Sequence, residues 1–426
     1  MDEAASRKLS RREFIGAGTT ASLMILNPRL VRGTAANSAV QVGILGCGAR
    51  GNTDGVSLVN NTPARVVALG DLFADQLAGA KQRFDELARQ KSYGGINAEQ
   101  LFLGPKAFEE LVGSKEVDAV VIATPPYYHP EHLEAAVAAG KHVYLEKPVS
   151  VDVHGAQRVI QAGEKARGRL SLDVGFQIRH APPFVELVSR IHGGAIGRIA
   201  CGQAYYDAIT VPRPPWPKAS PPERRLRNWL HDRVLSGDIM LEMAIHVVDV
   251  CNWTLHGHPL KAYGAGGRKV RTDQGDCWDD FELTYFYPND MRLSLNAVQF
   301  LKGWWDVGIR FFGTRGVSEA HYAGDVRILG EEPWDSGLRV GSEGQKFALT
   351  GAFAGALKDA DLEKHKAFVE SITSGKFHDE ARSGAESALS AILGRTAAYT
   401  SREVTWEELL RSDEAWDAGI DLNKLV

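Results

Sequence analysis

The chain has 426 residues, which is more than one hydrophobic core usually supports, so we expect two folded domains. Its 44% of hydrophobic and 24% of charged residues are typical of a globular protein. The net charge of -4 lacks the basic excess that a phosphate backbone demands, which argues against a nucleic-acid partner. The four cysteines show no C-x-x-C spacing and no Cys/His cluster, so no structural zinc or iron–sulfur centre is expected.

Residues 1–37 have the pattern of an export signal. Arg11 and Arg12 precede an apolar run from Phe14 that is too short to span a bilayer as a helix, and small residues suited to cleavage follow near Ala36. Adjacent arginines before such a run match the twin-arginine signal, whose receptor exports folded proteins. We therefore expect a periplasmic protein with no stable membrane insertion after signal cleavage. The alternative is an uncleaved amphipathic N-terminal helix.

Residues 38–174 alternate between short apolar strands and helical segments. The first strand breaks into G-C-G-A-R-G, with Gly46, Gly48 and Gly51 at the glycine positions of G-x-G-x-x-G. These glycines permit a tight turn and a close approach to a pyrophosphate, whose charge the N-terminus of the next helix stabilises. We therefore expect an N-terminal Rossmann domain with a doubly wound parallel sheet.

The second strand ends at Asp71, which lies 20 residues after Gly51. A carboxylate there accepts hydrogen bonds from an adenosine ribose and repels a 2'-phosphate, so we expect NAD rather than NADP. Two later strands end at Thr124 and at Glu146. Because ligands of doubly wound sheets bind at the carboxyl ends of the strands, the cofactor site is expected along this edge.

Residues 175–426 predict an α+β substrate-binding domain. Apolar and polar residues alternate from about residue 200 to about residue 315, with glycines at the turns, as in a large and mostly antiparallel sheet. Helices at about residues 360–400 are expected to pack back on the first domain. An exposed face of this sheet favours a homo-oligomer.

The stretch from Val211 to Arg225 contains six prolines, so neither a regular strand nor a helix is expected there. A lid, an arm between subunits and a plain surface loop are all compatible with this composition. Trp216 and Trp229 either stack on sugar faces or belong to the core.

Glu242, His246 and Asp249 follow one another at intervals of four and three residues, which places them on one stripe of a helix. The helix is apolar on several sides, so its charged groups need partners or a cavity. His246 either works in a site or hydrogen-bonds Glu242 or Asp249 within the core. Lys147 either faces the cleft or pairs with Glu146 on a solvated rim.

The order of G-C-G-A-R-G, then "ATPPYYH", then "LEKP", resembles the Gfo/Idh/MocA oxidoreductases, the family of glucose–fructose oxidoreductase and inositol dehydrogenase. The segments "GFQIRH" and "MLEMAIHVVDVCNW" fall where that family has its substrate-side motifs. The resemblance implies that the E-K-P lysine and a D-x-x-x-H pair surround the reacting carbon; here these are Lys147, Glu242 and His246. The family usually has Asp where this chain has Glu242.

The expected site residues follow from the residue pattern and the resemblance together. The substrate-binding candidates are Arg179 and Asp249, and no metal ligands are expected. The cofactor-binding candidates are Gly46, Gly48, Ala49, Arg50, Gly51, Asp71, Thr124, Pro125, His129, Glu146 and Lys147.

The chemistry of alcohol oxidation needs these residue types. Loss of hydride from a carbinol carbon requires that the hydroxyl proton pass to a base, and imidazole has a suitable pKa. We expect His246 to be that base, Glu242 to orient its tautomer and Lys147 to place positive charge at the developing oxyanion.

An exported enzyme meets no nicotinamide pool in the periplasm, so it must carry NAD with it and regenerate it. The expected function is an NAD-dependent oxidoreductase that acts on a secondary hydroxyl of a sugar, glycoside or cyclitol, with a tightly bound cofactor. The alternatives are a redox-neutral NAD-dependent glycoside hydrolase and a non-catalytic sugar-binding protein on the same fold.

Overall fold

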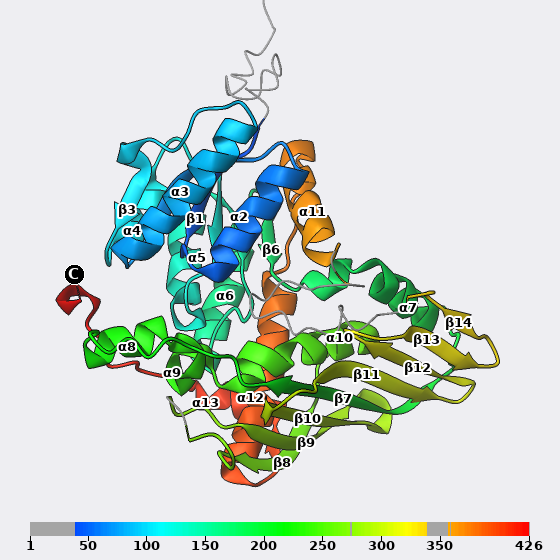
Figure 1. Cartoon of the computed structure of the whole chain (residues 1–426). Coiled ribbons are helices and arrows are strands. Elements are labelled where there is room, and N and C mark those ends of the chain that lie inside the picture. Colours follow the sequence, from blue (N-terminus) through cyan, green and yellow to red (C-terminus); the bar gives the residue numbers. More distant parts are fainter. Residues whose placement is uncertain (1–38, 273–274, 339–356, 358, 426) are drawn as a thin grey trace, which may run out of the picture. The chain divides into compact units, whose positions relative to one another are not determined.

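The computed structural model describes residues 39–272, 275–338, 357 and 359–425, so the predicted export signal lies outside the described residues. Two sheets organise the rest of the chain, with the first at the top of Figure 1 and the second at the bottom. Within the described part, no helix combines the length and the apolar character needed to cross a membrane. The four cysteines carry free thiols.

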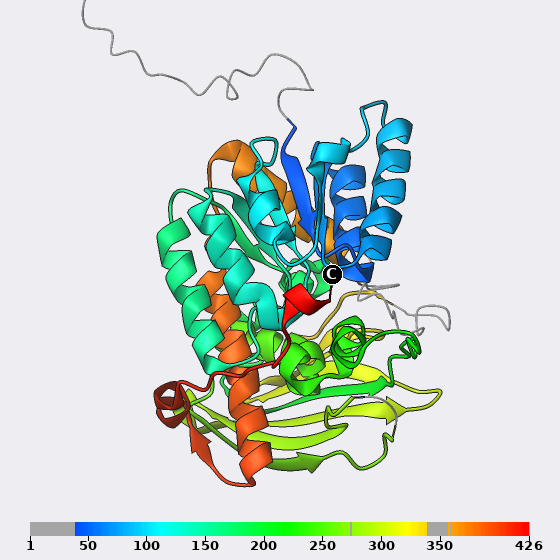
Figure 2. The same cartoon turned by 90° about the vertical axis from the view of Figure 1, so that its left-hand side faces the viewer.

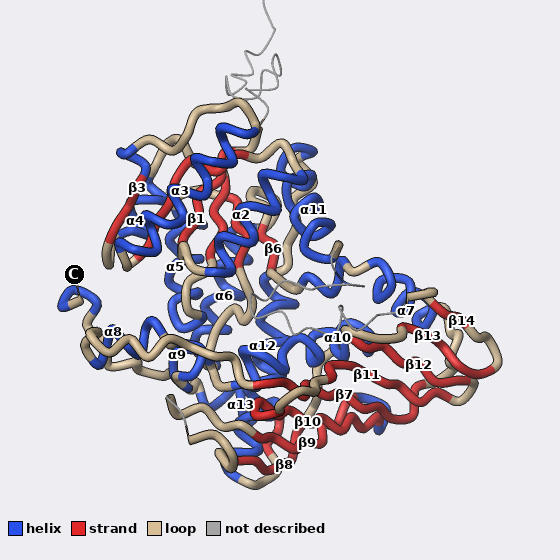
Figure 3. The backbone as a smooth tube through the Cα atoms, in the orientation of Figure 1, coloured by secondary structure: helices blue, strands red, loops and turns tan. Residues whose placement is uncertain are grey.

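In the described part of the chain, the first sheet has six strands in the order β3-β2-β1-β4-β5-β6, and every pair is parallel. The expected Rossmann sheet is therefore confirmed (Figure 3). Its strands are β1 (Gln41–Leu45), β2 (Arg65–Asp71), β3 (Leu101–Leu103), β4 (Ala119–Ile122), β5 (His142–Leu145) and β6 (Leu172–Val174).

Helices cover both faces of this sheet, which is why its strands are mostly apolar. On β4, Val120 and Ile122 join one core cluster, whereas Val121 joins the other. The first face is covered by α4 (Ala107–Gly113), α5 (His129–Ala138) and α6 (Val153–Ala166), and the second by α2 (Ala49–Asn61), α3 (Ala74–Gln90) and α11 (Ala360–Ser374).

In the same described residues, the second sheet has nine strands in the order β14-β13-β12-β11-β7-β10-β9-β8-β15. It is mixed but mostly antiparallel, as expected, because only β7 and β10 pair in parallel among its described strands. The strands are β7 (Ile199–Ile209), β8 (Lys261–Gly267), β9 (Asp280–Tyr287), β10 (Met291–Leu301), β11 (Asp306–Gly313), β12 (Gly316–His321), β13 (Val326–Gly330), β14 (Trp334–Asp335) and β15 (Val404–Thr405).

One face of the second sheet packs on helices. On β10, Leu293, Leu295 and Ala297 are buried, whereas Arg292 and Ser294 between them are exposed. The long helix α12 (Ala381–Thr400) contacts both α6 and β8 and so links the two halves of the fold (Figure 2). The other helices are α7 (Pro182–His192), α8 (Pro221–Arg227), α9 (Arg233–Ser236), α10 (Ile245–Leu255) and α13 (Trp406–Ser412), with a π-helical turn η6 (Met240–Ala244) before α10 and short 3-10 turns η2 (Ala98–Gln100), η3 (Pro126–Tyr128), η4 (Gln177–His180), η5 (Trp229–His231), η7 (Pro288–Asp290) and η9 (Leu422–Lys424).

The proline-rich segment differs from expectation, because its last part forms α8. Pro221 and Pro222 occupy the first turn of this helix, where a backbone N–H has no intrahelical acceptor and its loss costs nothing. The Ser220 hydroxyl caps the helix by accepting the Glu223 N–H. Residues 211–220 form neither strand nor helix, as expected.

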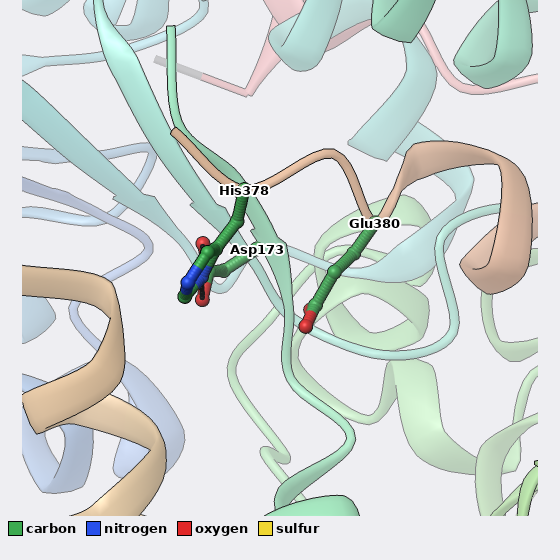
Figure 4. Close-up of side chains that lie close together, drawn as sticks. All are labelled: Asp173, His378 and Glu380. Carbon is green, nitrogen blue, oxygen red and sulfur yellow. Dashed lines mark hydrogen bonds and ion pairs between the residues drawn. The ribbon is translucent and has the colours of Figure 1, made fainter. Parts of the chain in front are cut away.

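A buried ionic cluster holds α11 and α12 at the end of β6. Asp173, His378 and Glu380 converge there closely enough to bridge a metal ion (Figure 4). The cation found between the two carboxylates is Lys364, whose Nζ donates to Asp173 at 3.3 Å and to Glu380. No metal ligands are expected from the sequence. The sequence pattern does not indicate this group of side chains, because Asp173 and His378 are 205 residues apart.

Replacement of Lys364 by Met is expected to leave the buried Asp173 carboxylate and the partly buried Glu380 carboxylate without the Lys364 ammonium and to lower the free energy of unfolding by about 3 kcal/mol. Urea unfolding followed by fluorescence measures this. Lys366→Met is the matched control on the same helix, because the Lys366 side chain is 42% exposed and, within the described residues, pairs with half-exposed Glu363 alone; its expected effect is below about 0.5 kcal/mol. Equal effects of the two substitutions would contradict the assigned role of Lys364.

Candidate active site

A cavity of about 550 Å³ lies at the carboxyl ends of β1, β2, β4 and β5 and continues to η6 and α10. Its size is in the range of ligand sites. Apart from Gly51, every residue expected to bind the cofactor lines it, and so do Glu242 and His246. Arg179 and Asp249 do not belong to its lining.

The glycine loop has the geometry that its motif predicts. Gly46 has φ of +92°, and a Cβ there would lie 2.6 Å from the Ala123 backbone. A Cβ on Gly51 would lie 2.0 Å from the Gly46 carbonyl oxygen, so only glycine lets α2 pack on the turn. At Gly48 a Cβ would meet no atom within 4 Å, which leaves the approach to the start of α2 open.

Asp71 is held at the end of β2 by main-chain donors. Its carboxylate accepts hydrogen bonds from the Cys47 N–H at 2.7 Å and the Phe73 N–H at 2.8 Å. Burial raises the pKa of Asp71, and these two hydrogen bonds oppose that rise. The carboxylate therefore has a fixed position in the cavity wall.

Arg50 turns toward carboxylates of three different elements. Its guanidinium lies 2.9 Å from Glu146, 3.0 Å from Asp54 on α2 and 2.7 Å from Asp361 on α11. Glu146 in turn accepts the main-chain N–H of Lys147 at 3.1 Å. Burial raises the pKa of Glu146 to about 8, although the Arg50 charge opposes the rise. Arg50 thus ties the cofactor loop to the strand end that carries Lys147.

His129 joins two strand ends. One ring nitrogen lies 2.7 Å from the Thr124 carbonyl oxygen and the other lies 2.8 Å from that of Pro148. The imidazole is buried, which lowers its pKa to about 4. The Thr124 hydroxyl contacts His132 at 3.0 Å. His129 therefore fixes the loops around the cavity floor.

Lys147 and Glu242 meet across the cavity. The Lys147 ammonium donates to the Glu242 carboxylate at 3.0 Å and to the main-chain carbonyl oxygen of the same residue at 2.6 Å. Both side chains are only 12% exposed. Burial raises the pKa of Glu242, and the positive charge of Lys147 opposes this shift. The second carboxylate oxygen, Oε2, is buried and has no hydrogen-bond partner among the described residues.

His246 lies beside this pair, at 7% exposure, between the rings of Tyr206 and Tyr322. Burial, reinforced by the charges of Lys147 and Arg50, holds its pKa well below the ordinary value. The imidazole is therefore neutral at neutral pH and able to accept a proton.

The structure does not show the predicted hydrogen bond by which Glu242 would orient His246. Within the described residues, Glu242 makes its side-chain hydrogen bond to Lys147 and none to His246. The reason is local: Glu242 lies in the π turn η6, whereas His246 lies in α10, so the expected single stripe of an α-helix is interrupted between them.

Arg179 and Asp249 pair with each other. Two guanidinium nitrogens each donate to Asp249 at 2.8 Å, and the Ser387 hydroxyl of α12 donates to the same carboxylate. Asp249 is 1% exposed. This geometry favours a structural role that links η4, α10 and α12, and it gives no support to the predicted contact with substrate.

Two cavity residues near Glu242 were not foreseen. Tyr206 and Arg213 line the wall there. Trp229, for which the sequence left stacking on a sugar and a place in the core open, also lines the cavity. Burial lowers the pKa of Arg213, and the charge of Glu242 opposes that shift. The alternation along β7 indicates an inward side chain at Tyr206, whereas nothing in a proline-rich segment indicates where Arg213 points.

Two family models match the chain. The one described as "Oxidoreductase family, NAD-binding Rossmann fold" matches residues 40–174, and the one described as "GFO/IDH/MocA C-terminal domain" matches residues 184–319. The inositol 2-dehydrogenase of Acidothermus cellulolyticus is 33% identical over 267 residues, which cover 62% of this chain and 68% of that relative. The chain belongs to the Gfo/Idh/MocA oxidoreductase family.

Other members of the Gfo/Idh/MocA family align over different lengths. The myo-inositol 2-dehydrogenase of Thermotoga maritima is 26% identical over 381 residues, which cover 87% of this chain and 100% of that relative. With inositol 2-dehydrogenases of several other bacteria, the chain spans only 55% to 62% of the relative's length. The crystal structure of scyllo-inositol dehydrogenase from Lactobacillus casei with bound NAD(H) and scyllo-inositol shares the fold, with a TM-score of 0.67 and 21% identity over 87% of this chain and 99% of that one.

The cavity residues fit the NAD that this family binds. Gly46 and Gly51 form the turn, Gly48 leaves room beside the N-terminus of α2 for a pyrophosphate, and Asp71 presents a fixed carboxylate for ribose hydroxyls. Lys147 and His246 line the same cavity and are the groups available to a nicotinamide and a substrate.

The two glycines of the loop are expected to respond differently to alanine. Gly51→Ala forces a contact of 2.0 Å with the Gly46 carbonyl oxygen, so the melting temperature should fall. Gly48→Ala meets no protein atom within 4 Å, so the melting temperature should hold while NAD affinity falls about tenfold. Thermal melts and NADH titration measure the pair. A Gly48→Ala protein that binds NADH as tightly as the wild type would contradict this assignment.

Proposed function

We propose that this protein oxidises a secondary hydroxyl of a sugar, glycoside or cyclitol and passes the hydride to NAD. The observation that carries the proposal is the convergence in one NAD-binding cavity of a buried ammonium, a carboxylate oxygen with no hydrogen-bond partner in the described part of the chain, and a neutral imidazole. Relatives and a structural neighbour named as dehydrogenases of inositols support a polyhydroxylated substrate.

Each residue has a separate task in this proposal. The neutral imidazole of His246 accepts the proton of the reacting hydroxyl, and the Lys147 ammonium stabilises the negative charge that develops on its oxygen. Glu242 positions that ammonium through its carboxylate and its main-chain carbonyl oxygen, and its free Oε2 can accept a hydrogen bond from a neighbouring hydroxyl. NAD, when bound, takes the hydride from the carbinol carbon.

The test is reduction of NAD by a panel of cyclitols, aldoses and glycosides, followed by the absorbance of the reduced cofactor. For a substrate found in this way, the rate of NAD reduction should fall about 100-fold or more in Lys147→Met and in His246→Gln. Binding of NADH should survive in His246→Gln, because His246 is not among the cofactor-binding candidates. Absence of cofactor reduction with every compound would contradict the proposal. Release of aglycone from a glycoside without any added acceptor would instead identify the redox-neutral hydrolase.

The pH profile tests the assignment of the base. Because the pKa of His246 lies below its ordinary value of 6.5, the imidazole stays unprotonated as the pH falls through 6.5, and kcat should decline only at lower pH. Lys147→Met removes one of the charges that lower this pKa, so its acid limb should move to higher pH. An acid limb at or above 6.5 in the wild type would assign the proton to another group.

Export and assembly complete the proposal. A twin-arginine signal in residues 1–37 would deliver a folded protein with NAD already bound to the periplasm, and an enzyme there would recycle its cofactor between two substrates. The exposed side chains on β7, β8 and β10 of the second sheet favour a homo-oligomer. Fractionation of cells and light scattering of the purified protein test the two statements; a cytoplasmic protein or a single-chain mass would contradict them.

A further inference from the structure

Arg227, the last residue of α8, reaches from the second half of the fold to the first turn of α3. Two guanidinium nitrogens each donate to a carboxylate oxygen of Asp75 at 3.0 Å, and the third donates to Glu223 at 2.8 Å. A bidentate pair of this kind fixes the plane of the guanidinium as well as its position. The side chain of Arg227 is only 12% exposed.

Two aromatic rings contact the same guanidinium. Its central carbon lies 3.9 Å from the centre of the Phe73 ring and 4.5 Å from that of Trp216. Phe73 follows β2 and Asp71, whereas Trp216 belongs to the proline-rich segment 211–220. Cation–π contacts of a largely desolvated guanidinium are stronger than those on the surface. One side chain therefore joins this segment to the turn after β2.

Trp216 has an unfavourable backbone conformation. Its φ of +46° lies in the left-handed region, which bulky residues rarely adopt. The indole ring lines the cavity, and its N–H is buried without a hydrogen-bond partner among the described residues. A buried N–H in that state costs free energy until an acceptor reaches it. These features point to a ligand in the cavity at this end.

A second layer lies over Arg227 and its helix. Leu422 lines the cavity and belongs, with Ala418 and Leu226, to a small apolar cluster. Trp229 packs against both this cluster and the main core. The Arg225 guanidinium donates to the Ala418 carbonyl oxygen at 2.8 Å. The last described residues of the chain lie beside α8 (Figure 1). The C-terminal segment thus packs against the outer side of α8.

We propose that Arg227 locks residues 211–227 over the adenosine half of bound NAD and thereby sets how long the cofactor stays. Asp71 marks the ribose position, and Phe73, Gln76, Trp216 and Arg227 line the cavity around that end. NAD can leave only after the pair with Asp75 and the contacts to both rings are broken together. The inference rests on NAD binding in this cavity and is independent of which hydroxyl is oxidised.

The experiment measures NADH release from the full-length protein without any sugar. Protein loaded with NADH is mixed with excess NAD, and the decay of energy transfer from tryptophan to NADH is followed. Arg227→Met should release NADH at least about tenfold faster than the wild type, because it removes the ion pair and both cation–π contacts. Arg224→Met is the matched control: Arg224 lies on the same helix and is exposed, and within the described residues its guanidinium donates to the Ala219 carbonyl oxygen alone, so release should be unchanged.

Asp75→Asn breaks the same contact from the other side at a half-exposed position, so it also covers the case in which Arg227→Met does not fold. The double variant should release NADH no faster than Arg227→Met alone, because both substitutions remove one interaction. Wild-type release rates in both single variants, or additive effects in the double variant, would overturn the proposal. Because no substrate is present, an enzyme that oxidises no sugar would still give readable release rates.

Discussion

The ammonium of Lys147, held by two oxygens of Glu242, joins the end of β5 to the π turn that precedes α10. Two charges with this little exposure are costly to bury unless their geometry is good and their remaining atoms are satisfied. The Lys147 ammonium contacts Oε1 and the main-chain oxygen of Glu242, whereas Oε2 of Glu242 has no hydrogen-bond partner among the described residues. The two sheets therefore hold a cavity whose polar wall is complete only when a ligand donates to that oxygen.

The layer beneath the pair distributes charge in a way that sequence motifs do not reveal. Arg50 faces three carboxylates, and burial raises the pKa of Glu146 to about 8 against the opposing charge of Arg50. Glu146 also accepts the main-chain N–H of Lys147. The position of the lysine is thus coupled through Arg50 to the cofactor loop and to α11, which comes from the other end of the chain.

The fold was predictable from local pattern, and the partners of the site residues were not. Strand β1, the three glycines and Asp71 follow from apolar runs and turn chemistry that act over a few residues. The family resemblance pointed to Lys147, Glu242 and His246 as site residues. The contact of Glu242 with Lys147 instead of His246 depends on a π turn, which the sequence pattern does not indicate. The partnership of Arg50 with Asp361 spans 311 residues, and only the folded chain brings it together. The prolines of residues 211–225 predict no helix, yet Pro221 and Pro222 lie in the first turn of α8, where proline is compatible with a helix.

The central claim, that Lys147, Glu242 and His246 act together on one hydroxyl, is tested most directly by a crystal structure with NADH and a bound cyclitol or sugar. The account predicts a carbinol oxygen within hydrogen-bond distance of both the Lys147 ammonium and the His246 ring, a neighbouring hydroxyl on Oε2 of Glu242 and the nicotinamide facing the same carbon. A substrate that binds elsewhere in the cavity, with the Lys147–Glu242 pair closed and contacted by no hydroxyl, would contradict it.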